Sequence, residues 1–379
     1  MREYPAPFDR HLQQEAARAR EIAALLAEGG IKAVVQDADL PLAGVAMYVA
    51  LLERSWAVRH EDPREMVSLA RAAVRVAEDL DSSFYGIKGV YDLQAKAWGQ
   101  LANALRVADD LAESERAFGT AFDLFRRGTG DPHLKVRLYD LHASFLGTRR
   151  LFGLAFSALD VVVDLYLELG ETHLAGRALI NKAIYTHYSG QPEEAIRISE
   201  RGIPMLDKDR EPELTFFAAH NKIWFLVACG RFREAKRELF LHGAGFQAAE
   251  GRVNYLKLRW LQAQVSLGLG EWKSAEAGLL EAREGLEAAG MGFHAALASL
   301  DLSLLWMRRG RWSEAEALGL EAAEVFIVLG IHREATGCVM ILKDAFKKKK
   351  ATVVLLESVV EFLRQAQIDP DARFTPRYE

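Results

Sequence analysis

Four short stretches of the sequence decide the fold: GQPEEA at residues 190–195, GRFREA at 230–235, GEWKSA at 270–275 and GRWSEA at 310–315. Each begins 40 residues after the one before it, and RLFGLA at 150–155 continues the series one step upstream. A related unit, DDLAES at 109–114, stands one residue out of phase. A repeat this regular predicts a row of equal structural units instead of one globular core.

The repeated positions are typical of helical hairpins. The glycine that opens most units would end one helix in a left-handed turn, which costs glycine little. The aromatic residue, leucine or proline two residues later would cover the turn or begin the next helix. A small residue closes each unit where two helices would cross closely: Ala155, Ala195, Ala235, Ala275 and Ala315. Apolar residues recur at spacings of three and four throughout, so the sequence predicts an all-α protein.

One unit resembles the tetratricopeptide repeat (TPR) in particular. Its successive signature positions are taken by Trp98, Leu101, Ala102, Leu105, Ser114, Phe118 and Ala121. The period of 40 residues exceeds the roughly 34 of the standard repeat, so the chain resembles the longer TPR-like variety found in bacterial regulatory and scaffold proteins. The resemblance implies a right-handed α-α superhelix, a TPR-like solenoid, over residues 91–363. It also implies that the chain binds a protein or a peptide.

Three segments are expected along the chain. Residues 1–90 would form an N-terminal helical cap, including a helix from Asp9 to Glu28, and a degenerate hairpin whose second helix begins after the capping residue Asp62. Residues 91–363 would form the repeat array. Residues 364–379, which are charged and interrupted by prolines, would form a short extended C-terminal tail.

Composition argues against several classes of partner. The formal net charge is -5 and the sequence pI is about 6.1, so no overall attraction draws the chain to nucleic acid or anionic lipid. No apolar run is long enough to span a membrane and no signal-like segment opens the sequence, so we expect a cytoplasmic protein without a membrane partner. The two cysteines, Cys229 and Cys338, are expected to be buried free thiols.

The sequence contains no recognisable catalytic or ligand-binding motif. It has no phosphate-binding loop, no paired metal-binding histidines and no cluster that combines an acid, a base and a nucleophile. We therefore expect no enzymatic activity, no cofactor and no metal. The lysine run Lys347–Lys350 is interpreted as a solvated connection beside a helix C-terminus, with contact to an anionic partner as the alternative.

Residues at equivalent repeat positions predict a binding groove. In a TPR-like superhelix the first helix of each hairpin lines the concave face. Asparagine amides there can pair with a peptide backbone, basic residues can meet a carboxylate, and tryptophan supplies a large rigid contact. The candidate groove residues are Arg137, Arg177, Asn181, Lys182, His187, Tyr188, His220, Asn221, Lys222, Trp224, Lys257, Trp260 and Gln264. The alternative is that the tryptophans belong to the core and the Asn-Lys pairs face water.

The leading hypothesis is a scaffold or regulatory module that binds a protein or peptide in this groove. One alternative is a peptide-responsive sensor arm of a bacterial transcriptional or signalling system, which would need an effector partner. Another is a structural adaptor that self-associates through its ends. An enzyme with a site between repeats is disfavoured, because the residues for chemistry do not cluster.

Overall fold

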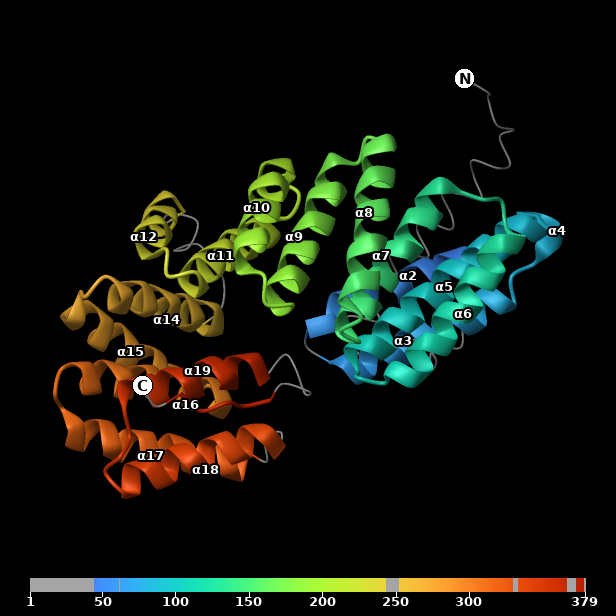
Figure 1. Cartoon of the computed structure of the whole chain (residues 1–379). Helices are drawn as coiled ribbons and strands as arrows, with labels where there is room; N and C mark the ends of the chain where they lie inside the picture. The colour runs from blue at the N-terminus through green and yellow to red at the C-terminus, as the bar shows by residue number, and fades with distance from the viewer. Residues whose placement is uncertain (1–43, 61, 243–251, 330–332, 367–372, 378–379) are drawn as a thin grey trace. The chain divides into compact units, whose positions relative to one another are not determined.

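The computed structural model describes residues 44–60, 62–242, 252–329, 333–366 and 373–377 (Figure 1). The expected cap helix from Asp9 to Glu28 lies outside these residues. The chain divides into two compact units, Met1–Glu171 and Thr172–Glu379, which are described one at a time. The described residues form helices, turns and irregular segments without a β-strand.

The first unit is a stack of antiparallel helices. They are α2 (Val45–Ala57), η1 (Val58–His60), α3 (Pro63–Glu78), α4 (Ser82–Tyr85), α5 (Ile87–Val107), α6 (Leu111–Arg127), α7 (Pro132–Thr148) and α8 (Phe152–Glu168). Helices α2 and α3, α5 and α6, and α7 and α8 pair as hairpins, and α5 contacts both α3 and α7. Asp62 caps α3 as expected, because its carboxylate accepts hydrogen bonds of 2.9 Å from the backbone N–H groups of Arg64 and Glu65.

The second unit continues the same pattern. Its helices are α9 (Thr172–Tyr188), α10 (Pro192–Gly202), η2 (Ile203–Met205), α11 (Pro212–Ala228), α12 (Phe232–Leu241), α14 (Arg252–Gly268), α15 (Trp272–Ala288), α16 (Gly292–Arg308), α17 (Trp312–Val328), α18 (Arg333–Lys347) and α19 (Val353–Ala366). The first helices of successive hairpins, α9, α11, α14 and α16, contact one another in that order. We call these four helices the first-helix row.

The repeat positions have the structural roles that their residue types predict. Gly190, Gly230, Gly270 and Gly310 all have positive φ angles, between 70° and 83°. Each closes a helix by donating a backbone hydrogen bond to a carbonyl three residues earlier, as from Gly190 to His187 over 2.9 Å. The five alanines that close the units are completely buried. The glycine turn and the small crossing residue are therefore confirmed.

Small residues also allow direct contact between the helices of a hairpin. The buried hydroxyl of Ser114 on α6 donates to the Ala102 carbonyl on α5 over 2.8 Å. In the second unit Ser303 on α16 donates to the Ala315 carbonyl on α17 over 2.6 Å, at the same separation of 12 residues. A larger side chain at either serine would push the two backbones apart.

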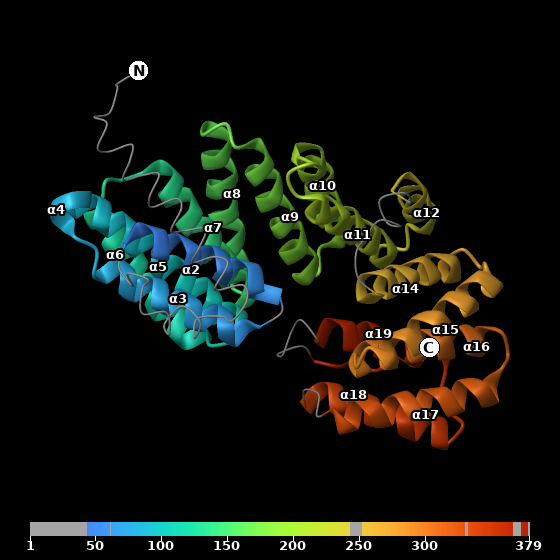
Figure 2. The same ribbon diagram turned by 180° about the vertical axis from the view of Figure 1, so that it is seen from behind.

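The C-terminal helices depart from the repeat. Helix α16 contacts α17, α17 contacts α18, α18 contacts α19, and α19 returns to contact α16, so the four close into a ring (Figure 1 and Figure 2). Their shared core includes Phe326, Val339 and Leu355. Helix α19 runs to Ala366, past the expected tail boundary at residue 363, and residues 373–377 have no regular structure.

In the portion of the chain that the structure describes, no helix combines the length and the apolar character needed to cross a bilayer.

Candidate functional site

The first-helix row of the second unit carries most of the candidate residues on one stripe. On α9, Arg177, Asn181 and Tyr188 follow one another at steps of four and seven residues, which keep side chains on one face of a helix. The same stripe on α11 contains Asn221, which lies 40 residues after Asn181, and Trp224, which lies 40 residues after Ile184. All five candidate residues are half-buried. On α14 the equivalent positions are taken by Lys257 and Gln264, which are also half-buried.

Lys222 does not share this stripe. It follows Asn221 directly, so its side chain leaves the helix about 100° away around the axis. Its ammonium pairs with Glu238 of α12 over 3.0 Å and with Glu200 of α10 over 3.5 Å. The sequence predicts that Lys222 faces the groove, but in the structure its side chain lies between the second helices α10 and α12. The carboxylates of two successive hairpins satisfy its charge.

Arg177 and Lys182 on α9 are half-buried and each has a partner of its own. Arg137 belongs to the first unit, where its guanidinium lies 3.5 Å from the buried carboxylate of Asp140 and 5.2 Å from the ring centre of Trp56. These three cations are therefore engaged by the protein, and we do not count them among the groups available to a ligand.

An aromatic cluster forms where α9 ends beside α11. The ring of His187 lies 4.3 Å from that of Trp224 and 4.8 Å from that of the buried Phe225, measured between centroids. Tyr188 lies 6.1 Å from Trp224. Burial lowers the pKa of His187 to about 4, so the imidazole is neutral at pH 7. Its Nδ1 atom is buried and has no hydrogen-bond partner among the described residues.

A second cluster surrounds Lys257 of α14. Burial lowers the pKa of His220 on α11 to about 4; a hydrogen bond with Asn221 opposes this shift, and the positive charge of Lys257 adds to it. Burial and the same lysine lower the pKa of His294 on α16. The ammonium thus lies near two imidazoles from neighbouring helices, and burial lowers the pKa of each. Within the described chain Lys257 forms no ion pair.

Trp260 and Gln264 are held by an acidic residue that sequence reasoning missed. The carboxylate of Asp301 on α16 is almost completely buried and accepts hydrogen bonds from the indole of Trp260 (2.7 Å) and the amide of Gln264 (2.8 Å). Arg364 of α19 donates to both of its oxygens, over 2.7 and 2.6 Å. A signal was present, because Asp301 occupies the repeat position of Asn181 and Asn221 in a largely apolar helix.

Three groups of the stripe remain available. The Asn181 amide, the indole N–H of Trp224 and the Lys257 ammonium make no hydrogen bond or ion pair to any residue that the structure describes, although all three side chains are half-buried. Sheltered polar groups normally have partners. These three come from contacting helices and offer an amide, an aromatic donor and a cation. The arrangement can recognise a ligand but includes no activated acid, base or nucleophile.

No family model matches the chain, and no curated protein matches it. Solved structures do match its fold. A Rap protein complexed with competence and sporulation factor superposes with a TM-score of 0.58 at 12% sequence identity, covering 85% of this chain and 87% of that one. Aspartyl phosphate phosphatase F from Bacillus subtilis superposes with a TM-score of 0.55 at 14% identity, over 79% and 75% of the two chains.

A third similar structure is a signal transduction ATPase with numerous domains from Pyrococcus horikoshii, which has a tetratricopeptide repeat sensor. Its TM-score is 0.61 at 14% identity, over 90% of this chain and 50% of that one. The sequence identities are low, and the agreement lies in the arrangement of helices. The chain has a TPR-like helical repeat fold.

Proposed function

We propose that this TPR-like array is a regulatory module that binds a protein segment or peptide along the first-helix row of its second unit. The observation that carries the proposal is a set of sheltered polar groups, on three helices in contact, that make no hydrogen bond or ion pair to a described residue: the Asn181 amide, the Trp224 indole N–H and the Lys257 ammonium. An extended peptide presents backbone N–H and C=O groups at regular intervals. The Asn181 amide can both donate to and accept from such a backbone, and Asn221 lies in phase with it one hairpin on.

The neighbouring groups favour binding over catalysis. His187 and His220 are neutral at pH 7, since burial lowers both pKa values to about 4, so they enlarge the surface without adding charge. Trp224 with His187 and Tyr188 forms a rigid aromatic surface of the kind that dominates binding energy at interfaces. Lys257 supplies a cation that no carboxylate of the described chain neutralises. We propose that the protein is not an enzyme.

The similar structures support this assignment by analogy. One is a Rap protein in complex with competence and sporulation factor, and another has a tetratricopeptide repeat described as a sensor. The second of these favours the alternative in which the array is a sensor arm of a signalling system. We further propose a cytoplasmic location, because the free thiols of Cys229 and Cys338 suit a reducing compartment.

The test is a pull-down from lysate of the source organism, with captured proteins and peptides identified by mass spectrometry. The wild-type chain is compared with a triple variant, Asn181→Ala, Trp224→Ala and Lys257→Ala. The matched control is Lys273→Ala with Glu284→Ala, two exposed residues on the second helix α15. Circular dichroism must show equal helicity for all three proteins.

A partner captured by the wild type and the control but lost from the triple variant supports binding on the first-helix row. Titration calorimetry of that partner should then show a loss of affinity in each single variant. A partner that the triple variant retains at wild-type affinity refutes the assignment of this surface.

A further inference from the structure

The outer face of α18 is unusual for a surface helix. Among its described residues the exposed ones are Gly337, Met340, Ile341, Asp344 and Lys347, which lie on one stripe of the helix, and the exposed Lys348 follows directly after the helix end. Met340 is 59% exposed and Ile341 36%. The opposite face, with Cys338, Val339 and Leu342, is buried in the ring of four helices. An amphipathic helix normally presents polar residues at the positions that Met340 and Ile341 occupy.

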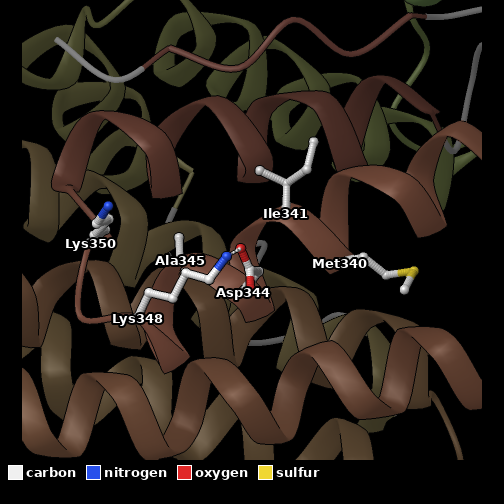
Figure 3. Close-up of a pocket in the computed structure, with 6 residues that line it drawn as sticks. All are labelled: Met340, Ile341, Asp344, Ala345, Lys348 and Lys350. Atoms are coloured by element: carbon white, nitrogen blue, oxygen red, sulfur yellow. Dashed lines mark ion pairs between the residues drawn. The ribbon is translucent and has the colours of Figure 1, made fainter.

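These two apolar side chains border a cavity of about 510 Å³ that is open to the surface and that Ala345, Asp344, Lys348 and Lys350 also line. Figure 3 shows Met340 and Ile341 on the same helix as the ion pair between Asp344 and Lys348, with Lys350 beyond the helix end. A cavity of this size accommodates one or two side chains of a partner. Gly337 leaves open space beside the stripe, because a Cβ atom there would meet no atom within 4 Å.

The lysine run gives this face a strong positive charge in an acidic chain. The Lys348 ammonium pairs with Asp344 over 2.7 Å, but Lys347, Lys349 and Lys350 have no ion pair within the described residues. On the adjacent helices Glu324 pairs with Lys343, Glu357 with Arg308 and Glu361 with Arg377, whereas Glu316 of α17 has no ion pair within the described residues. Lys347, Lys349 and Lys350 are thus three exposed cations that no described carboxylate pairs with.

The backbone fixes where these lysines stand. Lys349 has a φ of 54° at the position after α18 that glycine takes in most other turns of this chain. Its N–H donates to the Phe346 carbonyl over 2.9 Å, and that of Lys350 donates to the Ala345 carbonyl over 2.8 Å. The run is thus part of an ordered helix end beside the cavity. If the run were only a solvated connection, its positive charge would be explained but the apolar side chains around the adjoining cavity would not.

We propose that the outer face of α18 and the Lys347–Lys350 run form a second docking surface, which binds an acidic protein segment with an apolar anchor residue. The anchor enters the cavity beside Met340 and Ile341, and flanking aspartates or glutamates meet Lys347, Lys349 and Lys350. Nucleic acid fits less well, because the described side chains of this surface include no arginine or aromatic residue and Asp344 would repel a backbone phosphate. A membrane fits less well, because two apolar side chains around a hollow insert too little area.

The test selects peptides from a phage-displayed random dodecapeptide library on the full-length immobilised chain. Selected peptides are synthesised with a fluorescent label and titrated by fluorescence anisotropy. Met340→Asp removes the apolar contact, and Leu154→Asp is its matched control, since both side chains are 59% exposed. Lys347→Glu with Lys350→Glu reverses charge at the surface, and Lys88→Glu with Lys135→Glu is the control at two exposed lysines of the first unit.

The proposal expects selected peptides with an apolar residue among acidic ones. Met340→Asp and the lysine reversal should each weaken binding about tenfold or more, and both controls should bind as the wild type does. Peptides that bind without depending on Met340, or that lack acidic residues, would overturn it. A labelled oligothymidine and vesicles of anionic phospholipid are titrated in parallel. Lysine-dependent binding of either, without acidic peptides, would also overturn it. The Asn181, Trp224 and Lys257 triple variant should bind the selected peptides normally, which separates this result from the first-helix row.

Discussion

Replacing Arg364 by methionine tests whether the ion pair with Asp301 holds α19 on the repeat array. Methionine keeps most of the apolar stem and removes the guanidinium. Asp301 is 3% exposed as a residue, and it would keep only the neutral donors Trp260 and Gln264. Removing one partner of a fully buried pair costs about 3–5 kcal/mol. Arg364 is itself 32% exposed, so water can partly replace it, and we expect a cost of about 2 kcal/mol.

Native-state hydrogen exchange is the assay, because repeat arrays open locally and one global unfolding free energy does not describe them. A loss of about 2 kcal/mol lowers the protection of α19 amides by about thirtyfold. Arg377→Met is the matched control. It removes a guanidinium that pairs at the surface with Glu361 of α19, and both of these side chains are more than half exposed. We expect it to change protection little.

A third protein completes the measurement. Asp301→Asn combined with Arg364→Met removes both charges while leaving an acceptor for Trp260, so it should be more stable than Arg364→Met alone. Two results would contradict this reasoning: unchanged protection of α19 in Arg364→Met, or a double variant that is less stable than Arg364→Met. Either would show that the guanidinium does not stabilise α19 by compensating the buried charge of Asp301.

Three further predictions concern packing, charge placement and pH. Gly268→Ala should destabilise α14 by about 1–3 kcal/mol, because the new Cβ would lie 2.3 Å from the ring of Phe232. Gly119→Ala, on an open surface of α6, should stabilise that helix by about 0.5–1 kcal/mol, and equal changes in the hydrogen-exchange protection of the two helices would contradict the packing. Lys222→Met should cost about 2 kcal/mol, because the sheltered Glu238 would keep only His242, 3.5 Å away, yet it should leave partner capture intact. Lost capture without lost stability would assign Lys222 to the binding surface. The pKa values of His187 and His220 are about 4 in the folded protein and about 6.5 in the unfolded chain. The unfolded chain therefore takes up protons first as the pH falls from 6.5 toward 4. The free energy of unfolding is unaffected above about pH 6.5 and decreases over this range by up to about 3 kcal/mol for each histidine. Denaturation at a series of pH values should show this loss reduced in His187→Phe, and an unchanged pH profile would refute the assignment.

The sequence was sufficient to predict the repeat and its turns. Gly190 and its equivalents adopt positive φ, and Ala195 and its equivalents are buried, because each requirement is local: a left-handed turn and a close helix crossing. Repetition then supplies five independent copies of the same evidence. The ring at the C-terminal end could not be predicted in this way, because the return of α19 to α16 depends on how two helices pack and occurs once.

The sequence predicts where the candidate residues lie along each helix better than it predicts which side of the helix each side chain faces. Asn221 and Lys222 are adjacent in sequence, yet they leave the helix about 100° apart, so only one of them can join the stripe. Asp301 was missed because its role requires a partner, Arg364, that lies 63 residues away on α19. Whether Asn181, Trp224 and Lys257 bind a ligand stays a prediction.

The uniform hairpin length has a consequence for how such a chain changes over generations. From Gly190 to Gly310 the glycine turn inside each hairpin recurs after the same number of residues, and the crossing alanine keeps its place after each glycine. Unequal recombination can add or delete one interval from glycine to glycine, and the new junction then joins two equivalent turns. Each later helix still packs against a helix equivalent to its former neighbour. The interval that carries Asp301 is the exception, since its carboxylate is committed to Arg364 and a second copy would bury a charge with no counterion. Copy number is therefore free to vary upstream of α16 and constrained at α16 itself.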